Sequence, residues 1–165
     1  MVGTSHDTPA FSVTALREWW TGAGRRRYSQ TKRLFILADC GRGNGSRTRA
    51  WKYELQTRLC DRFGLTLTVC HYPPGTSKWN PIEHRLFSEI SKNWAGQPLD
   101  SYEIVLKFRR TTKTAAGLAV NATLLEGDYP TGIKVSEAQM NRLHLRQHRV
   151  LPMWNYTLVP ARSKM

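Results

Sequence analysis

From Val69 to Phe87 the chain reads VCHYPPGTSKWNPIEHRLF. The Pro-Pro-Gly triplet ends an apolar run with a turn, and polar residues follow it. Asn80 then precedes Pro81, which is typical of a helix start, because asparagine caps the first amides and proline suits the first turn. We therefore predict a strand, a loop and a helix, with the carboxylate of Glu83 in the first helical turn.

A second apolar run lies upstream. Residues 34–38 are all apolar, which predicts a strand buried on both faces, and the run ends at Asp39 before a glycine-rich loop. Apolar residues at helical spacing over residues 46–63 predict a helix with Gly64 as its stop. This strand–helix–strand–helix order favours an α/β fold with a parallel sheet, in which sites form beyond the carboxyl ends of the strands. Asp39 and the loop before Glu83 both map to that edge.

The remaining segments give shorter patterns. A helix is expected from Asp7 to about Gly22, followed by an exposed basic loop to Lys32, and residues 1–5 are too few for an element. The pattern changes after Gly117, so we divide the chain near residue 115 into an α/β part, 1–115, and a small basic α+β extension, 116–165. The other expected elements are a helix over 80–96 with Ile82, Leu86, Phe87, Ile90 and Trp94 inward, a helix over 101–114, a strand over 118–124, an extended piece over 133–135, a helix over 136–143 and a strand over 154–159.

The charge of the chain points to a polyanionic partner. Its 165 residues include 25 Lys and Arg against 12 Asp and Glu, a formal net charge of +13. This balance favours nucleic acid first and an acidic membrane surface second. No apolar run approaches the roughly 20 residues of a membrane span, and the cysteines show no paired spacing. We expect a soluble, cytoplasmic protein that associates with the nucleoid.

Two carboxylates are candidate catalytic groups, and each has a structural alternative. Glu83 fits a capping pattern, in which an acid reaches back to the cap amide, and local sequence alone favours that role. Asp39 fits a turn before a glycine-rich loop. Their coincidence at one sheet edge of a very basic protein favours catalysis, because two divalent cations held by carboxylates stabilise the attacking and leaving oxygens of phosphodiester displacement.

Two other kinds of site compete with the carboxylates. A thiol–imidazole zinc site would draw on Cys40, Cys70, His71 and His84, but the close ligand spacing of zinc sites is absent. Residues 41–45 are glycine-rich and precede a helix, as in a phosphate cradle, yet they lack the Gly-Lys-Ser/Thr ending of the nucleotide loop. We therefore rank both sites below the pair of carboxylates.

Two groups of residues are candidate DNA contacts by charge and stacking, one flanking Glu83 and one in the expected basic loop. Trp79 has the equally good alternative of covering the core, and the arginine run that of a solvated charged surface. The candidates are Lys78, Trp79, His84 and Arg85, together with Arg25, Arg26 and Arg27.

Motifs spread over nearly the whole chain match one known family. They are His6-Asp7-Thr8, Trp19-Trp20, Ile36-Leu37-Ala38-Asp39, Trp51-Lys52-Tyr53-Glu54-Leu55-Gln56, Val69-Cys70-His71, the run from Pro73 to Asn80, the run from Ile82 to Phe87, Gly132-Ile133-Lys134-Val135 and Trp154-Asn155-Tyr156-Thr157. In these motifs the chain resembles the insertion-sequence DDE transposases with a Rhodopirellula-type DDE domain. Arg42 departs from the small residue that the family leads us to expect beside Asp39.

The resemblance implies a ribonuclease-H-like, three-layer α/β fold and three acids that bind Mg²⁺ or Mn²⁺ to cleave and join DNA. By position, Asp39 is the second acid and Glu83 the third. The first acid belongs to an opening strand that precedes the matched part, and Asp7, beside a helix start, is a poor substitute. Residues 1–115 would then be a catalytic core without its first strands.

We therefore expect a transposase fragment with little or no activity alone, which acts on transposon ends and target DNA and forms homo-oligomers. The alternative hypothesis is a non-catalytic nucleic-acid-binding protein derived from a transposase. Such a protein keeps the basic surface and binds DNA in a salt-sensitive way, without magnesium dependence and without cleavage.

Overall fold

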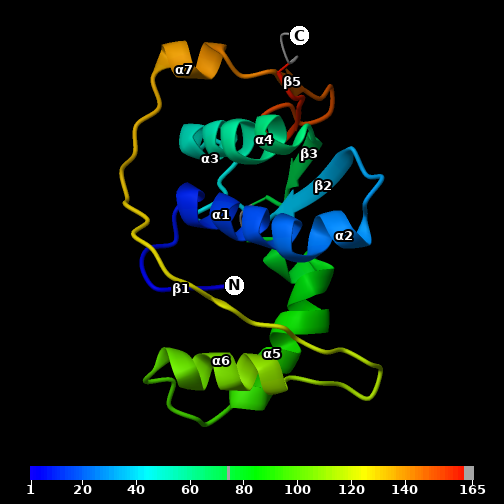
Figure 1. Ribbon diagram of the computed structural model, residues 1–165, viewed down its shortest axis with the longest axis vertical. Coiled ribbons are helices and arrows are strands. Elements are labelled where there is room, and N and C mark those ends of the chain that lie inside the picture. The colour runs from blue at the N-terminus through cyan, green and yellow to red at the C-terminus, as the bar shows by residue number, and fades with distance from the viewer. Residues whose placement is uncertain (74, 162–165) are drawn as a thin grey trace. The chain divides into compact units, whose positions relative to one another are not determined.

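The computed structural model describes residues 1–73 and 75–161 (Figure 1). Contacts divide the chain into two compact units, which are described separately. Unit 1 comprises Met1–Ser5 and Gly75–Asp128, and unit 2 comprises His6–Pro74 and Tyr129–Met165. The expected division near residue 115 follows a change of sequence pattern rather than contacts, and it stays a prediction.

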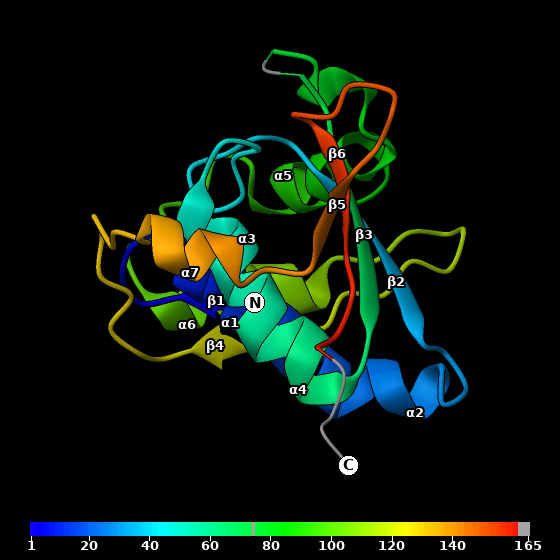
Figure 2. The ribbon, with the colours of Figure 1, turned by 90° about the horizontal axis from the view of Figure 1, so that it is seen from above.

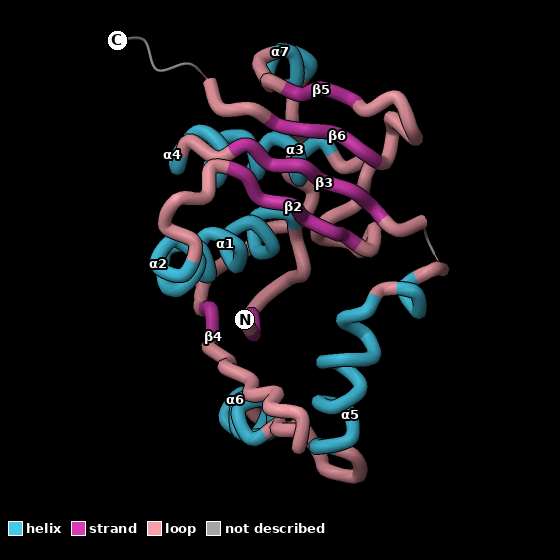
Figure 3. The backbone as a smooth tube through the Cα atoms, turned by 90° about the vertical axis from the view of Figure 1, so that its right-hand side faces the viewer, coloured by secondary structure: helices cyan, strands magenta, loops and turns pink. Residues whose placement is uncertain are grey.

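A four-stranded sheet lies at the centre of unit 2, in the order β2-β3-β6-β5 (Figure 3). β2 and β3 are parallel, whereas β6 is antiparallel to both of its neighbours. The strands are β2 (Arg33–Ala38), β3 (Thr66–His71), β5 (Leu145–Gln147) and β6 (Asn155–Leu158). The parallel pair and the closing strand β6 were predicted, and β5 was not.

Two long helices lie on one side of β2 and β3 (Figure 2). The first comprises α1 (Pro9–Trp19), the π-helical turn η1 (Trp20–Gly24) and α2 (Arg25–Arg27). The second comprises α3 (Arg49–Leu55), the π-helical turn η2 (Gln56–Cys60) and α4 (Asp61–Phe63). The predicted stop at Gly64 is confirmed, since this residue is left-handed with a φ of 63°.

The basic run lies in a helix rather than in a loop. We expected the first helix to end near Gly22, but the chain stays helical through Arg27. Gly24 permits this continuation, because a β-carbon there would lie only 2.7 Å from the Trp20 ring. Without a side chain at Gly24, the Trp20 ring packs closely against the helix and is buried.

The core of unit 2 lies between the sheet and these helices. We expected β2 to be buried on both faces, and this is wrong. Leu34 and Ile36 pack against the core, whereas Phe35 and Leu37 are 63% and 47% exposed. The reason is that β2 is an end strand of the sheet and the two helices cover one face only.

Unit 1 is mainly helical. Its helical segments are η3 (Ser77–Trp79), the π-helical turn η4 (Glu83–Phe87), α5 (Ser88–Trp94) and α6 (Tyr102–Thr111). Two short strands, β1 (Val2–Gly3) and β4 (Leu124–Leu125), pair in parallel. The helices predicted after Asn80 and after Ser101 are thus confirmed.

Three expectations for unit 1 are wrong. Residues 1–5 contain β1, and the strand expected over 118–124 is reduced to β4. Of the residues expected inward on the helix after Asn80, Ile82 and Phe87 are 40% and 43% exposed. The π-helical turn η4 explains this, because it adds residues per turn and shifts the face that a 3.6-residue period predicts.

One short helix completes unit 2. α7 (Glu137–Asn141) begins at Ser136, whose side chain and that of Gln139 form a reciprocal capping box, as predicted for this start. Residues 133–135, expected to be extended, lie in no helix or strand. Within the described chain, no helix is both long enough and apolar enough to cross a membrane.

Candidate functional site

Asp39 stands at the carboxyl end of β2, in unit 2. Its Oδ1 accepts hydrogen bonds from the amide of Gly41 at 3.1 Å and from Nδ2 of Asn44 at 2.9 Å. The residue is exposed, and Oδ2 has no hydrogen-bond partner within the described residues. The turn-forming role considered for Asp39 therefore occupies one oxygen and leaves the other accessible.

The loop after Asp39 packs closely on the start of α1. A β-carbon on Gly43 would lie 2.3 Å from Oγ of Ser12 and 2.5 Å from Oδ1 of Asp7, so a larger residue would displace both side chains. Cys40 opens the loop with a φ of 62°, which is uncommon for a residue with a side chain. The glycine-rich sequence therefore serves a close approach between loop and helix.

His71, at the end of β3, fastens the same loop. Its ring is buried, with Nδ1 2.7 Å from the carbonyl oxygen of Trp154 and Nε2 2.9 Å from that of Asn44. Both ring nitrogens are thus engaged and unavailable to a metal ion. Sequence reasoning considered His71 only as a zinc ligand and missed this role, which depends on partners 83 and 27 residues away.

The cysteines do not provide a zinc site either. Burial and the neighbouring Asp61 raise the pKa of Cys60 to about 12, and burial raises the pKa of Cys70. Raised values favour the neutral thiol in the metal-free protein. Among residues 1–73 and 75–161, no three His, Cys, Asp or Glu side chains lie together in a way that could hold a metal ion.

Glu83 lies in unit 1, where the helix after Asn80 begins. Oδ1 of Asn80 accepts from the amide of Ile82 at 3.3 Å, and its carbonyl oxygen accepts from the amide of Glu83 at 3.0 Å. Asn80 is therefore the predicted cap. The reciprocal bond from the Glu83 carboxylate to the cap amide is absent, and this partly exposed carboxylate has no hydrogen bond or ion pair within the described residues. The capping alternative for Glu83 is wrong.

The residues around Glu83 present charge and an aromatic surface. Trp79 is 69% exposed, so it does not cover the core, and Nζ of Lys78 lies 5.3 Å from its ring centroid. Nε2 of His84 lies 2.6 Å from the carbonyl oxygen of Lys78, which ties the loop to the helix. Arg85 is exposed. This part of unit 1 offers a stacking face with a cation beside it.

The arginine run forms a second basic surface, in unit 2. Arg25, Arg26 and Arg27 are exposed on α2, and the guanidinium of Arg27 lies 6.0 Å from the ring of Tyr28. Arg26 donates to the carbonyl oxygen of Gly22. No carboxylate pairs with these arginines among the ion pairs of the described residues.

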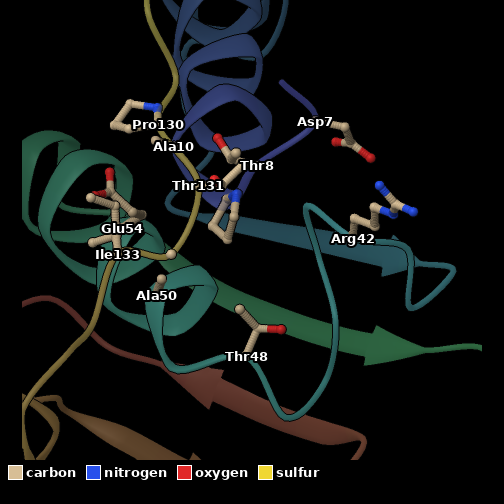
Figure 4. A pocket seen from close by; sticks show the side chains of 12 residues that line it. Asp7, Thr8, Ala10, Arg42, Thr48, Ala50, Glu54, Pro130, Thr131 and Ile133 are labelled. Atoms are coloured by element: carbon tan, nitrogen blue, oxygen red, sulfur yellow. The ribbon is translucent and has the colours of Figure 1, made fainter. Parts of the chain in front are cut away.

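A cavity of about 350 Å³ opens beside the loop that follows Asp39 (Figure 4). Asp7 and Arg42 point toward one another there, and Thr8, Thr48 and Glu54 supply further polar groups. The departure at Arg42 noted from the sequence thus places a guanidinium opposite Asp7. No sequence signal indicated this cavity, because its walls come from segments far apart in the chain.

A family model described as Rhodopirellula transposase DDE domain matches residues 1–160. Neither the curated proteins nor the solved structures contain a match.

Proposed function

Since the chain belongs to the family of Rhodopirellula transposase DDE domains, we propose that it cleaves and joins DNA strands with divalent cations held by Asp39 and Glu83. One observation carries the assignment: Oδ2 of Asp39 and both oxygens of Glu83 lack protein partners within the described residues. Carboxylate oxygens are the donors that Mg²⁺ and Mn²⁺ prefer, so the two side chains fit these ions. The proposal includes a ribonuclease-H-like fold.

Each residue has a defined part in this proposal. The bound cations supply charge that stabilises the attacking and leaving oxygens at a phosphate. Gly41 and Asn44 hold Oδ1 of Asp39, so that Oδ2 keeps a defined direction. Lys78 and Trp79 bind a DNA strand beside Glu83, by charge and by stacking against an exposed ring.

We propose that a third carboxylate comes from a strand that pairs with the outer edge of β2. β2 is an end strand, and an unpaired edge is a template for another strand. A groove of about 310 Å³ between α1 and β2 is lined only by apolar and aromatic residues, among them Trp19, Phe35 and Leu37. Adding an acidic peptide that can pair as a strand should slow hydrogen exchange of the β2 amides, and unchanged exchange would contradict this pairing.

The basic surfaces also favour the second candidate, a DNA-binding protein without catalysis. The net charge of +13 and the exposed Arg25–Arg27 run support it independently of any metal ion. It predicts DNA binding that weakens steeply with salt and does not respond to magnesium. Absence of binding at low salt would exclude it.

The test of the catalytic proposal is magnesium-dependent nicking of DNA that carries the ends of the element. Asp39→Ala and Glu83→Ala are compared with Glu103→Ala, a matched control because Glu103 is an exposed glutamate in the first turn of α6. Nicking should require Asp39 and Glu83 but not Glu103. An unchanged rate in the Asp39→Ala, Glu83→Ala double variant would overturn the proposal. If the chain alone is inactive, the same variants are compared in Mn²⁺ affinity.

A further inference from the structure

We propose that His71 is a positioning residue for Asp39, which acts through the loop 41–45. The inference rests on the proposed function in one respect, since it takes Asp39 as a metal ligand. Its structural basis is a continuous chain of hydrogen bonds within unit 2, from His71 to the backbone of Asn44 and from the side chain of Asn44 to Asp39.

The first step is the anchoring of Asn44. The imidazole of His71 lies between two carbonyl oxygens, that of Trp154 just before β6 and that of Asn44 in the loop. Carbonyl oxygens only accept, so a ring nitrogen that carries a proton donates to the carbonyl oxygen that faces it. The buried ring therefore fastens the loop to the sheet from a rigid position at the end of β3.

The side chain of Asn44 in turn holds the carboxylate of Asp39. Nδ2 of Asn44 donates to Oδ1 of Asp39 at 2.9 Å, while Oδ1 of Asn44 is buried and has no hydrogen-bond partner within the described residues. Apart from the bond to Asp39, the described residues therefore give the Asn44 side chain no hydrogen bond that would hold it. Its direction consequently depends on the backbone that His71 holds.

This chain of hydrogen bonds should strengthen the binding of a cation by Asp39. A carboxylate whose direction is fixed by outer hydrogen bonds binds a cation without first losing rotational freedom, and removing such outer partners typically weakens metal affinity about 10- to 100-fold. His71 touches neither the cation nor Asp39 in this scheme. Its effect should therefore pass through Asn44.

The experiment uses the full chain and two readouts, Mn²⁺ affinity by electron paramagnetic resonance and hydrogen exchange of the Gly41 amide, which donates to Asp39. His71→Phe should weaken Mn²⁺ binding about tenfold or more and speed Gly41 exchange. His71→Gln, which keeps one donor, should lie between His71→Phe and the wild type, and it serves if His71→Phe does not fold. Tyr156→Phe is the control, because the Tyr156 ring packs 5.8 Å from that of His71 but is not part of the hydrogen-bond chain.

A double-mutant cycle separates positioning from general destabilisation. If His71 acts through Asn44, the Mn²⁺ affinity lost in the His71→Phe, Asn44→Ala double variant should be smaller than the sum of the single losses. Additive losses, or wild-type affinity and Gly41 exchange in both His71 variants, would overturn the proposal. If Asp39→Asn leaves Mn²⁺ affinity unchanged, the proposed function fails instead, and Gly41 exchange alone then decides for or against positioning by His71.

Discussion

Asn44 donates from its side-chain amide to Oδ1 of Asp39 at 2.9 Å, from five residues further along the chain. The bond closes a small turn directly after β2, and Oδ2 of Asp39 has no hydrogen-bond partner among the described residues. The direction of the carboxylate thus depends on the path of the loop between the two residues. Substitutions that move this loop should therefore alter both the stability of unit 2 and the direction of the Asp39 carboxylate.

Gly43→Ala should destabilise the protein. The added methyl group would collide with Ser12 and Asp7, at 2.3 Å and 2.5 Å, and we expect a loss of about 1–3 kcal/mol in the free energy of unfolding. Urea denaturation measures it. Gly22→Ala is the matched control, since nothing lies within 4 Å of the place where its β-carbon would stand. This substitution should leave the free energy of unfolding unchanged or raise it. Equal effects of the two substitutions would contradict the loop packing.

The side chain of Gln56 joins the second helix to the backbone beside β5 and β6. Gln56→Leu should remove this connection. The buried amide of Gln56 donates to the carbonyl oxygen of Val159 at 2.9 Å and accepts from the amide of His144 at 3.1 Å. Leucine leaves both backbone groups unpaired, which should cost about 3 kcal/mol of unfolding free energy in a chemical denaturation experiment. Gln97→Leu, at an exposed position, should change it by less than about 0.5 kcal/mol.

Trp79→Ala should weaken binding of single-stranded DNA. Stacking of a base on an aromatic ring contributes about 1–3 kcal/mol, and Trp79 is 69% exposed with Lys78 beside it. Fluorescence anisotropy with a labelled oligonucleotide measures the loss. Phe35→Ala is the control, because Phe35 is an equally exposed aromatic at 63% without a neighbouring cation among the described pairs. Equal losses of DNA affinity in both variants would show that Trp79 contributes no more to binding than another exposed aromatic side chain.

Cys60 should make stability depend on pH in the alkaline range. Its pKa in the native state is raised to about 12, mainly by burial, so the unfolded chain loses this proton first. The stability linked to Cys60 is therefore complete below the unfolded pKa and declines as pH rises through the range up to about 12. From about pH 8 to about pH 10, urea midpoints should fall more steeply for the wild type than for Cys60→Ala. Parallel curves would contradict this prediction.

The sequence predicts local structure where spacing and capping residues determine it. The apolar run before Asp39, the helix that stops at Gly64 and the cap at Asn80 all follow from neighbouring residues, and all are confirmed. Asp39 could also be placed at a strand end in this way. These elements need no knowledge of the rest of the chain.

Sequence reasoning fails where distant segments decide the outcome. A run of apolar residues does not show whether a second layer covers it, so the exposure of Phe35 and Leu37 could not be foreseen. For His71 the sequence suggested only a zinc site that ranked below the carboxylates, because its actual partners, including the carbonyl oxygen of Trp154, lie far away in sequence. The π-helical turn η4 similarly changed which residues on its helix face inward.

The most direct test of the central claim is an Mn²⁺ titration of the labelled chain, followed by nuclear magnetic resonance. Asp39 and Glu83 belong to different units, and the proposal requires both to hold cations of one site. We predict that the amide signals of Gly41 and His84 broaden together at the same low Mn²⁺ concentration, while the amide of Glu103 is unaffected. Broadening at only one of the two, or equally at Glu103, would contradict a shared site.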